Sequence, residues 1–205
     1  MFLKKGESEL FFVHIPRSGG RYINYLFKNL NGYDSWYGTN DKYKGVEQMH
    51  LHLKLLKELP VYRSAPKFTV VRDPLDRFMS MMAGDFSLNS HLNKKVIVSD
   101  LKVFKLYLKD TSTLYRCFFT NWFKPQYEFI GKDCKIWRYE NGFGKSFHDF
   151  LYKEFNIILK VKKQKIIADG RFDNKKNQMV KLKPEFIKEV KKFYRKDYAL
   201  LGNYG

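Results

Sequence analysis

The sequence predicts an α/β fold with a central, mainly parallel sheet that is flanked by helices. Three short apolar runs of strand type, at residues 10–15, 68–71 and 135–139, are each followed by a stretch with helical spacing of apolar residues. Strands that alternate with helices imply parallel strands covered on both faces. The sequence therefore predicts three layers, with ligands bound at the carboxyl ends of the strands.

The first strand-to-helix unit begins with the run LFFVHI at residues 10–15. The short loop PRSGG at residues 16–20 follows, and from Tyr22 to Leu30 apolar residues recur at steps of three and four, as in a helix. Asn31 and Gly32 are expected to end this helix. The polar and aromatic stretch at residues 33–45 is predicted to be a loop.

The second and third units repeat this order. The run FTVV at residues 68–71 leads into Arg72-Asp73-Pro74, where Asp73 suits a helix cap and Pro74 the first helical turn. The run KIWRY at residues 135–139 precedes a helix with an apolar stripe over residues 143–155. Further helices are expected over residues 101–108, over 114–123 and from 184 onward. The stretch at residues 156–167 is left open between a strand and an irregular segment.

Composition and charge indicate one domain with an anionic partner. The 205 residues carry 39 Lys and Arg against 21 Asp and Glu, a net charge of +18, and 18% aromatic residues can build a core. We expect a single domain over residues 1–205, with a basic C-terminal segment from about residue 160. The sequence has no apolar run of membrane-spanning length and only two cysteines, so we expect a cytoplasmic protein without a zinc or disulfide framework.

The first loop has the composition of an anion site. Ser18, Gly19 and Gly20 allow close approach of the backbone to a phosphate or sulfate, and Arg17 supplies charge. Alone, the loop favours the alternative of a turn whose glycines only permit an unusual backbone angle. It lacks the Lys-Ser/Thr ending of a Walker A loop, which disfavours ATP with magnesium.

The second loop places Arg72 at a strand end and Ser80 about two helical turns later. An arginine fork and a hydroxyl are suitable ligands for a terminal phosphate. The alternative is that Asp73 and Arg77, four residues apart, form a surface ion pair and that Arg72 has only a local role.

The two loops, in this order, resemble the sulfotransferase family, in particular its carbohydrate-type branch. That family has a strand and a P-K-S/T-G-G/T type loop for the 5′-phosphosulfate, then a strand and R-D-P-x-x-R-x-x-S for the 3′-phosphate; residues 11–22 and 68–82 carry the match. A looser resemblance covers KIWRYEN at residues 135–141 and the ending FYRKDYALLGNYG at residues 193–205.

The resemblance implies a P-loop-like fold and 3′-phosphoadenosine 5′-phosphosulfate (PAPS) as sulfate donor, with no metal. It also implies a set of donor-binding residues: Arg17, Ser18, Gly19, Gly20, Arg21 and Tyr22 at the 5′ end, Arg72 and Ser80 at the 3′-phosphate, and Arg171 and Lys175 in a basic loop that closes over the nucleotide. That loop, GRFDNKKN at residues 170–177, equally fits a solvated surface loop. The chain departs from the family in having Arg17 where Lys is usual, and Arg21 and Tyr22 where Thr or Ser is common.

The acceptor hydroxyl needs a base, and histidine titrates near neutral pH. His50 and His52 lie between the two loops, where related carbohydrate sulfotransferases have a catalytic histidine. We expect His52 to be the base, with His50 and Arg17 as further catalytic residues and a sugar as the acceptor. The alternative is that both histidines lie on the polar side of a helix start.

Two other function classes remain. A P-loop kinase needs a Walker lysine and magnesium ligands, and neither is apparent. A nucleic-acid-binding module would use the basic C-terminal third, but its aromatic residues fall on helical core spacing, so we expect no nucleic-acid partner. A sulfotransferase fold that binds a nucleotide or polyanion without turnover is a third possibility, because of Arg17 and Arg21.

Overall fold

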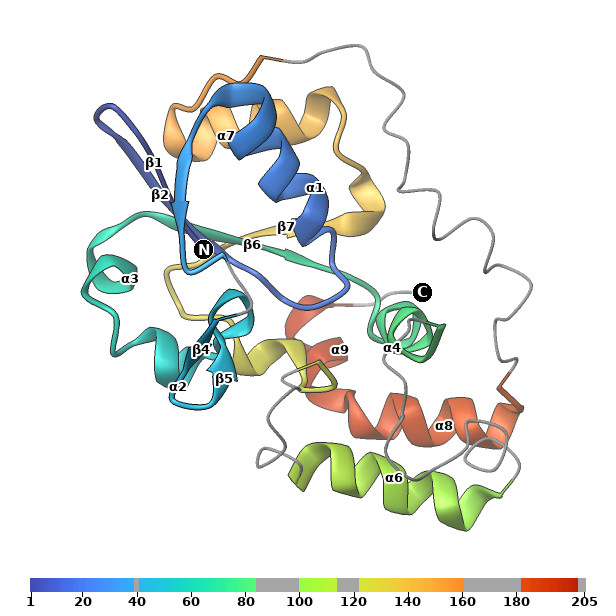
Figure 1. The fold of residues 1–205 in the computed structure, drawn as a ribbon. Coiled ribbons are helices and arrows are strands. Elements are labelled where there is room, and N and C mark those ends of the chain that lie inside the picture. Colours follow the sequence, from blue (N-terminus) through green and yellow to red (C-terminus); the bar gives the residue numbers. More distant parts are fainter. Residues whose placement is uncertain (39–40, 84–99, 114–121, 161–181, 203–205) are drawn as a thin grey trace.

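The computed structural model describes residues 1–38, 41–83, 100–113, 122–160 and 182–202. They form a mixed α/β fold around a five-stranded sheet with the strand order β3-β1-β2-β6-β7 (Figure 1). The strands are β1 (Phe2–Lys5), β2 (Ser8–Val13), β3 (Asp34–Trp36), β6 (Lys67–Val71) and β7 (Lys135–Arg138). The predicted Arg171, Lys175 and basic closing loop lie outside the described residues.

The three strands predicted from the sequence, β2, β6 and β7, run parallel to one another. β2 pairs in parallel with β6, and β6 with β7, whereas β1 runs antiparallel to both of its neighbours. All five residues of β6 are buried, as expected for a central strand covered on both faces. Four of the five strands therefore run in one direction, in agreement with the predicted mainly parallel sheet.

Two details of the prediction for the N-terminal region are wrong. β2 ends at Val13, so His14 and Ile15 already belong to the loop. The region from residue 33 to 45 contains β3 and a small hairpin of β4 (Lys42–Tyr43) and β5 (Val46–Glu47), rather than a loop alone. Strands of two or three residues are too short to show an alternating apolar pattern, so their pairing is a tertiary effect.

Helices cover both faces of the sheet (Figure 1). One face is covered by α1 (Gly20–Asn24), which continues as the π-helical turn η1 (Tyr25–Leu30), and by α7 (Lys145–Phe155). Their apolar residues form one core cluster with the sheet: Phe12, Phe27, Phe68, Phe147 and Leu151 are members. This side confirms the predicted helical stripes after the first and third strands.

Shorter elements cover the opposite face. They are η2 (Gln48–His50), α2 (Leu53–Leu56), α3 (Pro60–Ser64), η4 (Gln126–Glu128) and α9 (Arg195–Leu201). A second core cluster, with Phe11, Leu56 and Phe129 among its members, joins them to the sheet. The sheet therefore has helical layers on both sides, as predicted.

Three longer helices form a lobe beside the sheet edge at which β6 ends (Figure 1). They are α4 (Pro74–Ala83), α6 (Leu101–Thr113) and α8 (Pro184–Phe193). Their apolar faces share a third cluster that includes Phe78, Phe104 and Phe186. The predicted cap is present at the start of α4, where Asp73 Oδ1 accepts a hydrogen bond of 2.8 Å from the N–H of Asp76. The sheet and this lobe meet at the two motif loops.

Candidate functional site

The two motif loops lie side by side because they leave adjacent parallel strands. β2 and β6 are hydrogen-bonded neighbours, with Val13 opposite Thr69, so the chain leaves both strands at the same edge of the sheet. Residues 14–19 then lead into α1, and residues 72–73 lead into α4. The sequence prediction that both loops would share one crevice edge is consistent with this arrangement.

The first loop holds an unusual backbone conformation. Arg17 has φ 66° and Gly19 has φ 87°, both in the left-handed region. A Cβ on Gly19 would also lie 2.6 Å from the Phe143 ring, so the glycine is required on two grounds. A non-glycine residue at positive φ is uncommon and costs free energy that the surrounding contacts must offset. At Arg17 these contacts come from the second loop.

Arg17 and the second loop are tied together directly. Arg17 Nε donates a hydrogen bond of 3.1 Å to Ser80 Oγ, and Arg72 Nη1 donates one of 3.4 Å to the Arg17 carbonyl oxygen. Burial, and then the nearby Arg21 and Arg72, lower the pKa of Arg17 to about 10. Arg17 is still protonated at neutral pH, so this arrangement concentrates positive charge where the loops meet.

Two buried polar atoms at this point have no hydrogen-bond partner within the part of the chain that the structure describes. They are Ser18 Oγ and Arg72 Nε. The Arg72 guanidinium also lies 4.8 Å from the centre of the Tyr139 ring, a cation–π contact. Buried polar groups are normally paired, and a donor with no partner beside concentrated positive charge suits an incoming oxyanion.

Arg77 lies in the protein interior and not on the surface. It is fully buried and does not form a surface pair with Asp73. Its Nε donates to the Pro16 carbonyl at 3.0 Å, and its Nη2 donates to the carbonyls of Trp122 and Lys124 at 2.6 and 2.9 Å. Arg77 thus joins the first loop to the chain at residues 122–124. No local pattern of residues indicates this role.

Gln126 and Asp197 form a second set of supports that sequence reasoning missed. The Gln126 side-chain amide accepts from the Arg72 N–H at 3.0 Å and donates to the Arg72 carbonyl at 2.7 Å. Asp197 in turn accepts from the N–H groups of Gln126 and Tyr127 at 2.8 and 2.9 Å, and its burial raises its pKa. Asp197 is the aspartate of the closing motif at residues 193–205.

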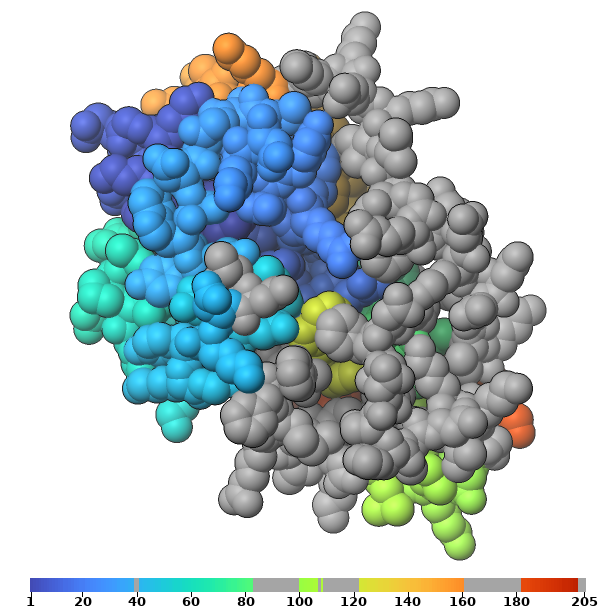
Figure 2. Space-filling model, in the orientation of Figure 1, coloured from blue at the N-terminus to red at the C-terminus, as the bar shows by residue number. Residues whose placement is uncertain are grey.

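The histidines lie in two different environments. His50 is buried, its Nδ1 is 2.6 Å from Glu47 Oε2, and its ring is 4.6 Å from His14 and 5.3 Å from Trp122. Burial lowers the pKa of His50, which the Glu47 carboxylate opposes. Trp122 also lies 6.0 Å from the Arg17 guanidinium, so His50 shares a neighbour with the first loop. In Figure 2, part of the segment that follows residue 122 (yellow) lies next to the N-terminal half of the chain (blue).

His52 is partly exposed and precedes α2. Burial, and then Lys124, lower its pKa to about 4, so it is neutral at physiological pH. The charged groups that act on it are Lys124, Glu128, Lys54 and Glu58 rather than the arginines of the two loops. The structure thus does not bring His52 into direct contact with Arg17 or Arg72.

The remaining predicted residues flank the first loop. Arg21 is exposed, and the Tyr22 ring packs 4.7 Å from Phe143. Glu140 Oε1 accepts a hydrogen bond of 2.6 Å from the Asp73 N–H, so it supports the second loop. Among the described residues, no group of three or more His, Cys, Asp or Glu is placed to hold a metal ion. None of the described helices is long and apolar enough to cross a bilayer.

The chain was compared with known protein families. Residues 1–97 match the model of the sulfotransferase family. This sulfotransferase match includes both motif loops, Ser80 and the two histidines between the loops. It points to a transferase that moves a sulfuryl group. A search of curated proteins and a search of solved structures each found no match.

The sulfotransferase match confirms the resemblance over the first two strand-to-helix units. It ends before η4 and α9, which provide Gln126 and Asp197, and before Tyr139, which directly follows β7. The supports of the second loop therefore come from the part of the chain beyond the matched residues.

Gly20 provides a first prediction at this site. A Cβ at this position would lie 1.8 Å from His14 Nε2, and the His14 ring is enclosed by Phe12 and His50. We expect Gly20→Ala to lower the free energy of unfolding by about 1–3 kcal/mol through overpacking. Urea denaturation of the variant checks this.

A matched control is Gly144→Ala, because a Cβ there would meet no atom within 4 Å. The double variant His14→Ala/Gly20→Ala tests the cause. If His14 is the obstacle, adding Gly20→Ala to the His14→Ala protein costs almost nothing. An equal cost in both backgrounds would contradict the steric explanation.

Proposed function

We propose that this protein transfers a sulfuryl group from PAPS to a hydroxyl of a carbohydrate acceptor, on a P-loop-like fold. The observation that carries the proposal is that Arg17, Arg72 and Ser80, which come from two loops, contact one another. Beside these contacts, Ser18 Oγ and Arg72 Nε have no hydrogen-bond partner among the described residues. A nucleotide with charged groups at both its 3′ and 5′ positions needs two separate anion sites, and two loops from adjacent strands can supply them.

Each loop takes one end of the donor in this proposal. Arg17 and the backbone from Ser18 to Arg21 bind the 5′-phosphosulfate. Arg72 and Ser80 bind the 3′-phosphate. Tyr22 supports the first loop through its packing on Phe143. The basic segment from about residue 160, with Arg171 and Lys175, is proposed to close over the bound nucleotide.

In the proposed reaction the acceptor oxygen attacks sulfur in line with the leaving group. The new bond joins sulfur to the acceptor oxygen, and the bond between sulfur and the bridging oxygen of the 5′-phosphate breaks. The electron pair stays on the 5′-phosphate of 3′-phosphoadenosine 5′-phosphate (PAP), and the hydroxyl proton goes to a base. Arg17 and the loop N–H groups stabilise the growing negative charge. Since these cations neutralise the leaving group, we propose that the transfer needs no metal.

His52 is the proposed base because it is neutral and partly exposed, so an acceptor can reach it. His50 is buried beside Glu47, and we assign it a supporting role in holding Trp122 near Arg17. Of the aromatic residues near the sheet edge, Trp36 packs 5.7 Å from the Phe2 ring but is 47% exposed, and we propose that it meets a sugar ring, whereas Tyr33 is buried against Phe27.

The donor assignment is tested by nucleotide affinity. We expect PAP to bind at least tenfold more tightly than adenosine 5′-phosphate, because charge-assisted hydrogen bonds to a 3′-phosphate are worth about 1.5–3 kcal/mol. Arg72→Ala is expected to remove most of this preference. Isothermal titration calorimetry with both nucleotides measures it.

Arg63→Ala is the control, because Arg63 is an exposed arginine on α3 and takes no part in the two loops. It is expected to keep the preference for PAP. Equal affinity of the parent protein for PAP and adenosine 5′-phosphate would refute the assignment of the second loop.

A further inference from the structure

The side-chain amide of Gln126 holds the backbone of Arg72 at the point where the sheet ends. The ladder between β2 and β6 reaches Thr69, and the ladder between β6 and β7 reaches Val71, which lies opposite Arg138. Arg72 therefore lies beyond both ladders. The Gln126 oxygen accepts from the Arg72 N–H at 3.0 Å, and the Gln126 nitrogen donates to the Arg72 carbonyl at 2.7 Å. The amide thus pairs with Arg72 as a neighbouring strand would.

The polar groups of Gln126 are all committed within the protein. Gln126 is fully buried, its own N–H donates to Asp197 at 2.8 Å, and its carbonyl accepts from the Phe129 N–H at 3.0 Å. To pair with both backbone groups of Arg72, a side chain must offer a donor and an acceptor together, as the amide of glutamine does. An ionised carboxylate of the same length would accept from the Arg72 N–H but could not donate to its carbonyl. The contact therefore depends on an amide at position 126.

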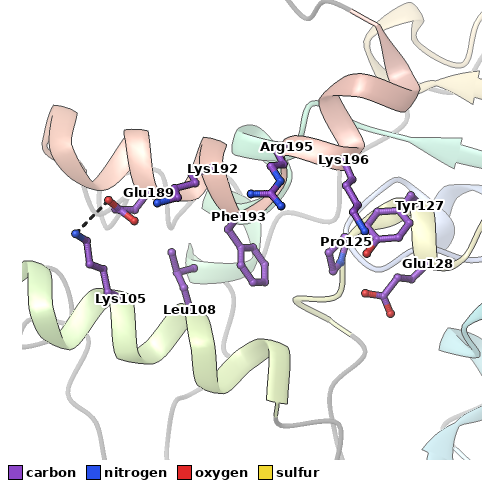
Figure 3. A pocket seen from close by; sticks show the side chains of 10 residues that line it. All are labelled: Lys105, Leu108, Pro125, Tyr127, Glu128, Glu189, Lys192, Phe193, Arg195 and Lys196. Atoms are coloured by element: carbon purple, nitrogen blue, oxygen red, sulfur yellow. Dashed lines mark ion pairs between the residues drawn. The ribbon is translucent and has the colours of Figure 1, made fainter.

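The segment that carries Gln126 is anchored by α9. Asp197 accepts from the N–H groups of Gln126 and Tyr127, and the Lys196 ammonium lies 5.2 Å from the centre of the Tyr127 ring. Pro125 and Tyr127, the chain neighbours of Gln126, line a pocket of about 510 Å³ with residues of α6, α8 and α9 (Figure 3). The side chain of Gln126 contacts Arg72 instead, so η4 connects α9 to the second loop.

The guanidinium of Arg72 is held less firmly than its backbone. Nη1 donates to the Arg17 carbonyl at 3.4 Å, the Tyr139 ring centre lies 4.8 Å away, and Nε has no hydrogen-bond partner among the described residues. Hydrogen bonds weaken steeply as distance and angle depart from the optimum, and an arginine fork binds a phosphate through such directed bonds. The place of the Arg72 backbone therefore decides how well its guanidinium can meet an anion.

We propose that Gln126 is a positioning residue for the 3′-phosphate of the donor. It holds the Arg72 backbone where the guanidinium meets that phosphate, and it thereby sets the preference for a 3′-phosphorylated nucleotide. The inference rests on the proposed function, because the proposed function names the 3′-phosphate as the group that Arg72 binds. Gln126 acts only through Arg72, so its loss changes which nucleotide is preferred.

The test compares Gln126→Met with Asn31→Leu. Methionine has nearly the length of glutamine but pairs with neither backbone group of Arg72. Asn31 is a matched control, because it is also a buried amide that joins two backbone groups. Its Nδ2 donates to the Leu26 carbonyl at 2.8 Å, and its Oδ1 accepts from the Lys160 N–H at 2.7 Å. Gln126→Ala and Asn31→Ala form a second pair, to be used if either larger side chain prevents folding.

The measured quantity is the ratio of the Kd for adenosine 5′-phosphate to the Kd for PAP, from calorimetric titrations, with urea denaturation as the measure of stability. We expect this ratio to fall at least tenfold in Gln126→Met and at least threefold in Gln126→Ala, and the Kd for adenosine 5′-phosphate to stay within threefold. Both Asn31 variants are expected to keep the parent's ratio within twofold. A loss of stability alone lowers the fraction of folded protein and leaves the ratio unchanged.

Two results would overturn the inference and leave the donor assignment intact. One is a parent's ratio that persists in the folded Gln126 variants, and the other is an equal fall of the ratio in the Asn31 variants. Equal affinity of the parent for PAP and adenosine 5′-phosphate would instead refute the donor assignment, and the inference with it.

Discussion

Replacing Arg77 by alanine is expected to lower the free energy of unfolding by about 3–5 kcal/mol, because a fully buried charged partner is removed from a hydrogen-bonded network. The carbonyls of Pro16, Trp122 and Lys124 would all lose their donor. Since Pro16 begins the first loop, we also expect PAP affinity to fall by more than tenfold. Urea denaturation and calorimetry measure the two effects.

Two further variants test whether the effect of Arg77→Ala comes from the loss of its hydrogen bonds to the three carbonyls. Arg63→Ala removes an exposed arginine and is expected to change the free energy of unfolding by less than about 0.5 kcal/mol. Arg77→Lys keeps the charge but cannot reach all three carbonyls at once, so it is expected to restore part of the stability and little of the nucleotide affinity. An unfolding midpoint of Arg77→Ala equal to that of the parent would show that the network does not hold the loop.

His52→Ala is expected to lower kcat by about 10²–10⁴-fold and to leave PAP affinity unchanged, as for a group that acts only on the acceptor proton. His50→Ala is expected to have a smaller effect, because His50 is buried beside Glu47 and acts through Trp122. Single-turnover transfer of radiolabelled sulfate to an oligosaccharide measures both.

The pH dependence of kcat/KM distinguishes a histidine that acts as the base from a histidine that has only a structural role. A base works in its neutral form, and burial beside Lys124 lowers the pKa of His52 to about 4. We therefore expect kcat/KM to stay level from pH 8 to about pH 5 and to fall as pH drops toward 4. If neither histidine variant changes the rate, the base lies elsewhere or the protein binds the donor without turnover.

Two of the strands that build the site, β2 and β6, could be predicted from the sequence because each contains an apolar run that is buried in the sheet. β7 is partly exposed, and it could be predicted because the run KIWRY precedes a helical apolar stripe. The cap at Asp73 follows from local chemistry. β1 was missed because only its first two residues are buried and its last two are exposed, which leaves no run or alternation to detect.

The buried contacts that hold the two loops in place could not be predicted in the same way. Asp73 and Arg77 are four residues apart, a spacing typical of a surface pair, yet α4 turns Arg77 into the protein toward carbonyls at Pro16 and Trp122. Such contacts depend on how the lobe packs against the sheet, and no local pattern encodes that packing. The two functional loops themselves were recognisable because their residue types are constrained by chemistry and not by packing.

The sequence separation of these contacts has a consequence for the order of events in folding. Arg17 reaches Ser80 across 63 residues, Arg77 reaches Trp122 across 45, and Gln126 reaches Asp197 across 71. Closing such long intervals is entropically costly and slow compared with forming hairpins and helices. The segment at residues 1–97 contains the recognisable loops, but the contacts that hold them come from later in the chain. On a ribosome, therefore, the loops emerge long before α9, and the site gains its final geometry only after α9 has been synthesised.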